Sequence, residues 1–497
     1  MDFVVFFPAV LILYFVLPAK ARNIFLLAAS YFFYAVYSPV LTLYLVVCTL
    51  VTYGIALLIE KKRDGASAKT WAVIGVVLNL GALAFYKYFN FFSGMITGML
   101  SASGVSTQAH RLDLVVPLGI SFITFQTVSY IIDVYRNKLH AEKRILRFAL
   151  YVAFFPKVVQ GPIERAADIL PQFDEVHSFD IKRFREGMIM VLYGMFMKMV
   201  VADKAAVIVN LIYADPAGHS GAALALATLL FTMQIYYDFA GYSYTAIGAA
   251  KVLGIEFKQN FRQPYLSTSV AEFWRRWHIS LNTWLRDYLY IPLGGSRCSS
   301  SRTRFNTLVT FGLSGLWHGA NWGYVIWGLL NGVYINIEKA LKGWQKSRQK
   351  PSETPLSPVR LGIRRAVHGV VTFCLVSFAW IFFRAATLQT SVKVIGGIFG
   401  RFDFPSFWSY VTEQLAGGAG TLVYGLDAAY GVPVLLIGMA IIVVIDALTN
   451  KRNLAKEMAE GSRAIRWIAC LGMIFAILLF GVYGYGYNAS TFIYTNF

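Results

Sequence analysis

The chain has 497 residues, of which 57% are hydrophobic and only 14% are charged, and its formal net charge is +19. Soluble domains carry about 25% charged residues, so this composition excludes an ordinary soluble enzyme and predicts a polytopic membrane protein. The Lys and Arg residues cluster between apolar runs, as contact with anionic lipid predicts, and they give no support for nucleic acid as a partner.

Apolar segments follow one another along the whole chain. A spanning helix needs roughly 20 apolar residues, and this length predicts an all-α bundle of about 11–13 membrane-embedded helices. Some segments are too short or too long for one crossing, so we expect broken or re-entrant helices among them. The segments are 2–18, 24–37, 39–59, 70–87, 88–101, 115–134, 146–160, 186–212, 221–253, 307–338, 364–383, 430–448 and 464–485.

The basic gaps between these segments orient the chain. They follow the first and third spans and cover about 136–147, 339–365 and 449–463, and the positive-inside rule places them in the cytoplasm. Both termini are then expected to be extracytoplasmic. The first apolar run lacks a basic n-region and a small-residue cleavage site, so we interpret it as a retained helix. No internal repeat points to an inverted-repeat transporter.

An acidic residue, Asp238, lies inside the apolar run 221–253. An acid at membrane depth must pair with another group or line a polar cavity. We therefore expect Asp238 to orient a histidine or to hold the helix bundle together.

Residues 263–297 read QPYLSTSVAEFWRRWHISLNTWLRDYLYIPLGGSR and predict a basic amphipathic helix. It would begin near Val270, with Glu272 in a capping box and one of three hydroxyl residues as the cap. The capping candidates are Ser267, Thr268 and Ser269. The predicted aromatic face consists of Phe273, Trp274, Trp277, Leu281, Trp284, Leu285 and Tyr288.

Two interpretations of this basic helix remain open. It could anchor the chain at the interface, with Trp at headgroup depth and Arg on lipid phosphates. Alternatively, Arg275, Arg276 and Arg286 could attract an anionic cytosolic substrate, because the planar guanidinium suits phosphates. Coenzyme A, nucleotides and lipid headgroups all carry such phosphates.

The stretch GLSGLWHGANWGYVIWG, residues 312–328, contains a single ionisable residue, His318. A histidine at membrane depth is a functional-site hypothesis, and histidine is the most frequent general base. The competing interpretation is a neutral imidazole satisfied between helices. The neighbouring glycines permit close helix packing, while Trp317 and Asn321 suit the lining of a narrow tunnel. The glycines are Gly312, Gly315, Gly319 and Gly323.

A metal site is not expected here. His278 lies forty residues before His318 and no HxxxH pattern accompanies either residue. Zinc needs three or four ligands, so we predict neither a metal nor a permanently bound cofactor.

Several of these stretches together resemble the membrane-bound O-acyltransferase family, in particular its bacterial cell-envelope branch, whose members act in alginate O-acetylation, peptidoglycan O-acetylation and teichoic-acid D-alanylation. The resemblance covers essentially the whole chain, which we treat as one domain, 1–497, with core motifs at about 115–340, helices at 364–485 and a tail at 486–497. One departure is Tyr244, where the alginate branch commonly has an acid. The matching stretches are EFWRRWHISLNTWLRDYLYIPLGG, GLWHGANWGYVIWGLLNG, PLGISFITFQTVSYIIDVYR, FFPKVVQGPIERAADILPQF, QIYYDFAGYSYTAIGAAKVLGI, FAWIFFRA and STFIYTNF.

The resemblance implies a helix bundle around a central funnel in the bacterial inner membrane. It implies that acetyl-CoA is the cytosolic donor, that His318 is the active histidine, and that His278 is a second histidine on the cytosolic side of the tunnel. An extracytoplasmic acetyltransferase partner with a serine nucleophile, of the SGNH type, would then modify an envelope polysaccharide such as an alginate-like polymer or peptidoglycan.

The apolar tail STFIYTNF suggests a role for Tyr494. A tyrosine hydroxyl, with a pKa near 10, deprotonates far more readily than a sugar hydroxyl. Tyr494 could therefore carry the acyl group transiently. A frayed end, with direct transfer to a partner or polymer, is the alternative.

Two other classes of protein compete with an O-acyltransferase. A non-catalytic transporter of an acyl donor or lipid-linked substrate would also use an intramembrane histidine. A structural anchor for an envelope export complex would not need the imidazole of His318 for any reaction.

Overall fold

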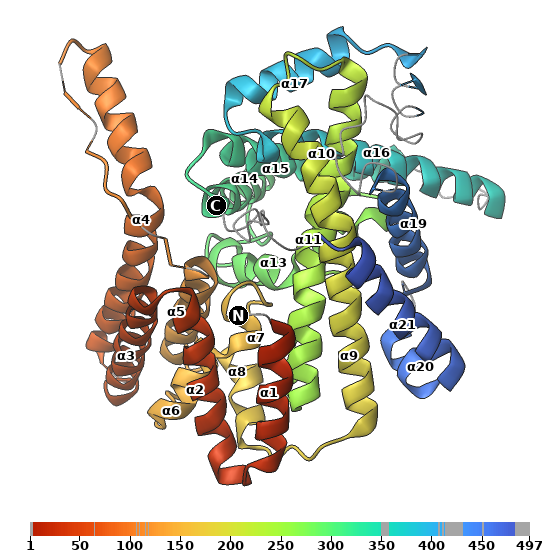
Figure 1. Cartoon of the computed structure of the whole chain (residues 1–497). Helices are drawn as coiled ribbons and strands as arrows, with labels where there is room; N and C mark the ends of the chain where they lie inside the picture. The colour runs from red at the N-terminus through yellow and green to blue at the C-terminus, as the bar shows by residue number, and fades with distance from the viewer. Residues whose placement is uncertain are drawn as a thin grey trace. The chain divides into compact units, whose positions relative to one another are not determined.

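A computed structural model shows an all-α protein in the part of the chain that it describes (Figure 1). The described residues are 3–482 except 64, 106, 109, 115, 118, 349–356, 406–407, 410–411, 413–430 and 450–451. No β-strand occurs among them. The predicted all-α membrane class is thus confirmed.

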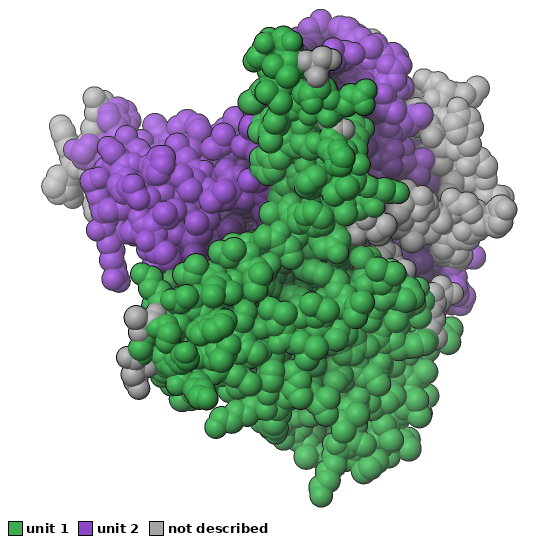
Figure 2. Space-filling model, turned by 90° about the vertical axis from the view of Figure 1, so that its left-hand side faces the viewer, with its two compact units in different colours: residues 1–191, 245–259 green, residues 192–244, 260–497 purple. Residues whose placement is uncertain are grey.

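The chain divides into two compact units, which Figure 2 colours separately. Unit 1 comprises residues 1–191 and 245–259, and unit 2 comprises residues 192–244 and 260–497. Helices α9 (Ile181–Met195) and α11 (Gly221–Leu253) contribute residues to both units. The other elements of unit 1 are α1 (Phe3–Val16), α2 (Ala19–Tyr37), α3 (Pro39–Lys61), α4 (Ala66–Ala102), α5 (Ile120–Tyr135), α6 (Ile145–Ala153), α7 (Phe155–Val158), α8 (Ala166–Ile169) and the 3₁₀ turn η1 (Pro171–Asp174).

Unit 2 contains short broken helices as well as long ones. Its two π-helical turns are η2 (Phe196–Ala202) and η4 (Arg286–Tyr290), and η3 (Pro264–Leu266) is a 3₁₀ turn. Its α-helices are α10 (Asp203–Ala214), α12 (Val270–Arg276), α13 (Ile279–Leu285), α14 (Ser300–His318), α15 (Trp322–Arg348), α16 (Pro358–Arg384), α17 (Leu388–Gly400), α19 (Gly431–Thr449), α20 (Leu454–Glu460) and α21 (Arg463–Phe480).

Six helices in the described residues are long and apolar enough to cross a membrane. They are α3, α4 from Ser67, α11, α16, α19 and α21. Helices α1 and α5 are apolar but shorter. These helices make the chain a multi-pass membrane protein, and several other apolar segments are broken, as the sequence predicted.

Several predicted boundaries differ from the structure, and three cases show why. The segments 70–87 and 88–101 form one helix, α4, because a single charged residue, Lys87, does not interrupt a helix that has no proline. The segment 307–338 is instead two helices, α14 and α15, separated at Gly319, whose backbone is extended. The segment 186–212 is divided among α9, η2 and α10.

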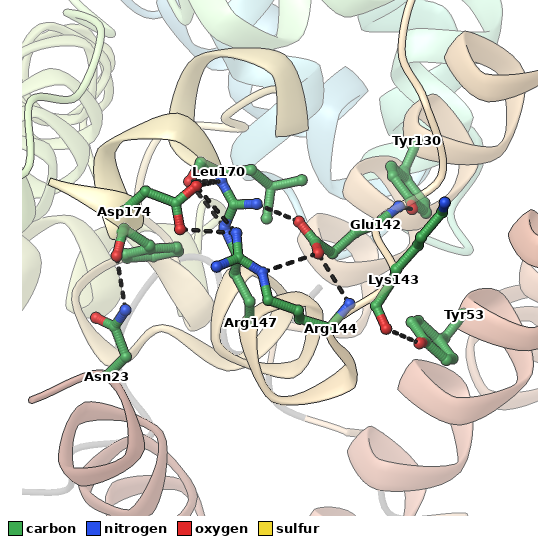
Figure 3. Close-up of polar contacts among 10 residues, drawn as sticks. Asn23, Tyr53, Tyr130, Glu142, Lys143, Arg144, Arg147, Leu170 and Asp174 are labelled. Atoms are coloured by element: carbon green, nitrogen blue, oxygen red, sulfur yellow. Dashed lines mark hydrogen bonds and ion pairs between the residues drawn. The ribbon is translucent and has the colours of Figure 1, made fainter. Parts of the chain in front are cut away.

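A polar network fixes the start of α6 within unit 1 (Figure 3). Arg144 and Arg147 contact the two carboxylate oxygens of Asp174 at 2.7 and 2.6 Å, and Arg147 also pairs with Glu142. Nearby, the Asn23 amide donates to the Phe173 carbonyl at 2.6 Å. These two arginines of the basic segment 136–147 therefore form ion pairs within unit 1.

Candidate functional site

Helices α14 and α15 form a tight hairpin that positions His318 at the C-terminal end of α14. A Cβ at Gly315 would collide with the Tyr324 carbonyl oxygen, and one at Gly328 would collide with the Phe311 carbonyl oxygen. Only glycine at these two positions lets the helix backbones approach so closely. Close packing is thus confirmed for Gly315, one of the four predicted glycines, whereas Gly328 was not among them.

His318 lies in an aromatic cage. Its imidazole is 4.8 Å from the Trp317 ring centre and 5.1 Å from those of Trp327 and Phe383. The residue is 3% exposed. Trp327 and Phe383 are themselves buried, so the cage keeps bulk water away from the imidazole.

The predicted basic helix at 263–297 is not continuous. It begins at Val270 as expected, and the Ser269 hydroxyl accepts from the Glu272 N–H at 3.1 Å. It then breaks at Trp277, which is extended, and at His278, which has the left-handed φ of 43°. The expectation of one amphipathic helix was therefore wrong.

Hydrogen bonds from outside the segment explain this break. The Arg262 N–H donates to the Arg276 carbonyl, and the Ile279 N–H donates to the Asn260 carbonyl, each at 2.9 Å. From within the segment, the Asn282 amide donates to the carbonyls of Trp274 and Trp277 at 2.8 and 2.6 Å. These bonds satisfy backbone groups that a helix would otherwise pair internally.

The break places His278 in the interior of unit 2. Its ring stands edge-on to Phe239 at 4.6 Å and lies 6.1 Å from the Trp317 ring centre. His278 is fully buried, and this burial lowers the pKa of its imidazole to about 3. His278 is therefore neutral at physiological pH, which suits a positioning or hydrogen-bonding role.

A cavity of about 230 Å³ lies beside this site in unit 2. Three hydroxyl side chains of α14, those of Thr307, Thr310 and Ser314, line it together with two basic residues, Arg286 and Lys339. The remaining lining residues are Asn282, Leu285, Tyr290, Phe311 and Ile335. Ser314 precedes His318 by four residues and thus shares its helix face, so the polar wall leads along α14 toward the imidazole.

Of the three arginines expected to bind an anionic substrate, only Arg286 lines this cavity. Arg276 is paired with Glu272 at 2.7 Å, and Arg275 is exposed. The three tryptophans of the aromatic face, Trp274, Trp277 and Trp284, are buried within unit 2 and are not available to lipid headgroups. This burial removes the basis for a simple interfacial anchor.

Two residues expected to line the site have different surroundings. Trp317 packs against both histidines. Asn321 instead precedes α15, where its side-chain oxygen Oδ1 accepts from the Gly323 N–H at 2.8 Å and its side-chain amide donates to the Ala386 carbonyl at 2.7 Å. Asn321 thus fixes the turn after His318.

Sequence reasoning missed several residues of the site. Glu338 of α15 accepts from the N–H groups of Val270 and Ala271 at 2.8 and 3.1 Å, which ties α12 to α15. A sequence pattern could have predicted the polar wall of the cavity. Three hydroxyl residues recur at helical spacing on the face of α14 that ends in His318, namely Thr307, Thr310 and Ser314.

Asp238 forms an ion pair, which is one of the two alternatives that the sequence left open. The Lys198 ammonium lies 2.8 Å from the Asp238 carboxylate and 2.6 Å from that of Asp203. These contacts join α11 to η2 and the start of α10. Tyr494, the predicted acyl carrier, lies outside the described residues.

Comparison with known proteins defines the class to which this site belongs. The model of the membrane-bound O-acyltransferase family matches residues 26–378. The chain belongs to this family, and the protein is a membrane O-acyltransferase.

The relatives are bacterial envelope enzymes. The chain is 36% identical over 486 residues to a probable alginate O-acetylase of Pseudomonas putida, covering 96% of this chain and 94% of that protein. It is 39% identical over 406 residues to a probable alginate O-acetylase of Azotobacter vinelandii, covering 80% and 77%. It is 31% identical over 428 residues to a peptidoglycan O-acetyltransferase of Helicobacter pylori, covering 80% and 78%.

Proposed function

We propose that this protein takes an acetyl group from cytosolic acetyl-CoA and delivers it for O-acetylation of an extracytoplasmic polysaccharide, with His318 as the general base. The family and the printed names of the relatives support O-acetyl transfer. The observation that carries the assignment is the polar cavity whose wall, on α14, ends one helical turn before His318.

The cavity suits the donor. Arg286 and Lys339 can attract the phosphates of coenzyme A, and guanidinium and ammonium groups are the usual phosphate partners. The hydroxyl groups of Thr307, Thr310 and Ser314 can hydrogen-bond the amides of the pantetheine arm. The thioester at the end of this arm would then lie toward His318.

At His318 the reaction moves one proton in two transfers. The acceptor hydroxyl oxygen attacks the thioester carbonyl carbon, and the imidazole takes the hydroxyl proton as the C–O bond forms. The C–S bond then breaks, and the thiolate of coenzyme A receives the proton. General-base assistance of this kind typically contributes 10²–10⁴-fold, and the aromatic cage limits wasteful hydrolysis by excluding water.

The first acceptor in this proposal is the Tyr494 hydroxyl. Its acyl ester would retain much of the transfer potential of the thioester, and an extracytoplasmic serine-nucleophile transferase would move the group to the polymer. An alginate-like polysaccharide and peptidoglycan are the candidate polymers, in line with the printed names of the relatives.

Purified protein incubated with acetyl-CoA labelled in the acetyl group tests this function. We expect acyl labelling of the protein or acceptor-dependent release of coenzyme A, with loss in His318→Ala and retention in the control His219→Ala. Tyr494→Phe should remove the label on the protein while leaving donor binding intact. Passage of intact labelled donor into protein-containing vesicles would instead indicate a transporter, and normal polymer modification with His318→Ala would indicate a structural anchor.

A further inference from the structure

Helix α19 carries two polar residues at the end of an otherwise apolar membrane span, Asp446 and Thr449. They are three residues apart and therefore lie on one face of the helix. Asp446 is 8% exposed. An acid at such depth is costly and marks a function by default, so the groups that it contacts indicate its role.

Asp446 holds a tyrosine that packs against the His278 turn. Its carboxylate accepts from the Tyr236 hydroxyl at 2.9 Å. Tyr236 is 1% exposed, and its ring centre lies 6.2 Å from that of Trp277, the residue before His278. The same ring contacts Phe261 at 5.8 Å, within the loop that bonds to this turn.

Thr449 binds the segment that is hydrogen-bonded to the same turn. Its hydroxyl accepts from the Gln263 side-chain amide at 3.1 Å. Gln263 directly follows Arg262, whose N–H binds the Arg276 carbonyl just before the helix break. The two polar residues of α19 thus bind Tyr236 and Gln263, and they act on the His278 turn through these two residues.

The turn needs such support because its backbone is strained. Among the described residues, three that are not glycine have positive φ, and two of them are Gln263 and His278, each at 43°. Such conformations cost of order 1–3 kcal/mol each and persist only where the surroundings fix them. The α19 contacts and the bonds from Asn260 and Arg262 supply that constraint.

We propose that Asp446 and Thr449 are positioning residues that hold His278 in its left-handed conformation against Trp317. This inference rests on the proposed function of the site, since it assigns the two residues to the acyl-transfer reaction through His278. Neither residue is among those that line the cavity, so their effect should fall on turnover and not on donor binding.

Hydrogen–deuterium exchange tests the geometry without reference to activity. Asp446→Leu leaves the Tyr236 hydroxyl without its acceptor, and we expect amide exchange within 260–280 to rise about tenfold, the factor that loss of a buried hydrogen bond gives. Tyr236→Phe removes the same bond from the other side and should raise exchange in the same peptide. Asp446→Asn keeps an acceptor oxygen and should stay near wild type, as should Leu448→Ala, a change at an exposed position of the same helix.

Kinetics then separates this inference from the proposed function. Asp446→Leu and Thr449→Val should lower kcat for acyl transfer several-fold with an unchanged KM for acetyl-CoA, and Asp446→Asn should restore kcat. Unchanged exchange at 260–280 in both Asp446→Leu and Tyr236→Phe would overturn the inference, whatever the activity. Raised exchange in a protein whose wild type transfers no acyl group would overturn the proposed function and leave the structural role of α19 standing.

Discussion

The imidazoles of His278 and His318 pack against the same indole, that of Trp317, at ring-centre distances of 6.1 and 4.8 Å. The two histidines are forty residues apart in the chain and belong to different elements. Trp317 therefore joins the strained turn at His278 to the cage around His318. A substitution that moves one histidine should also change the position of the other.

Replacement of Trp317 tests this connection. Trp317→Ala should lower the free energy of unfolding by about 3–5 kcal/mol, as truncation of a buried Trp does, and should abolish acyl transfer. Trp317→Phe keeps a ring between the histidines and should retain measurable turnover. Thermal unfolding in detergent and labelled acetyl transfer are the measurements. Equal activity of the Ala variant and the wild type would show that the indole does not link the two sites.

The glycines of the α14–α15 hairpin give a matched pair. Gly315→Ala brings a Cβ against the Tyr324 carbonyl oxygen and should destabilise the protein by about 1–3 kcal/mol, the usual cost of overpacking. Gly312→Ala meets only the end of the Leu329 side chain, at 3.2 Å, and should be tolerated. Melting temperatures of the two variants decide the question, and similar losses in both would contradict the packing described here.

The neutral state of His278 has a consequence for pH dependence. Burial lowers its pKa from 6.5 to about 3, so the unfolded chain binds more protons than the folded one between these values. Above pH 6.5 His278 is neutral in both states and does not reduce the free energy of unfolding. As the pH falls from 6.5 toward 3, protonation of the unfolded chain lowers that free energy progressively.

His278→Asn should therefore lose less stability than the wild type between pH 6.5 and pH 4, by up to a few kcal/mol. Chemical denaturation at both pH values measures this difference. An equal loss of unfolding free energy in the two proteins would show that the pKa of His278 is not lowered in the folded state.

Lys339 tests the assignment of the cavity to the donor. Lys339→Met removes one charge from the cavity lining and should raise the KM for acetyl-CoA about tenfold, because hydrogen bonds to charged groups contribute about 1.5–3 kcal/mol. Lys342→Met changes an exposed lysine of the same helix and serves as the control. Steady-state kinetics at fixed ionic strength gives both values, and an equal effect of the two variants would refute a specific role.

Much of the site could be read from the sequence because its signals are local. His318 stands out as the one ionisable residue in its stretch, and the glycines around it predicted close packing. The start of the helix at Val270 was predicted as well, and the structure selects Ser269 from the three candidate caps. Asp238 required a partner, and the structure supplies Lys198.

The break at His278 could not be predicted in this way. The residues from Val270 to Tyr288 have continuous helical periodicity, and the groups that end the helix, Asn260 and Arg262, come from a separate loop. Long-range hydrogen bonds thus override local pattern. The hydrogen bond between Tyr236 and Asp446 likewise could not be predicted from local sequence patterns, because the two residues are 210 positions apart.

The central claim is that His318 is the base for acyl transfer. The most direct measurement compares the single-turnover rate of acetyl transfer with the affinity for acetyl-CoA in wild type and His318→Ala. We expect a rate loss of about 10²–10⁴-fold, with the dissociation constant of acetyl-CoA changed less than about threefold because the cavity is intact. A variant that transfers acetyl at the wild-type rate would contradict the account.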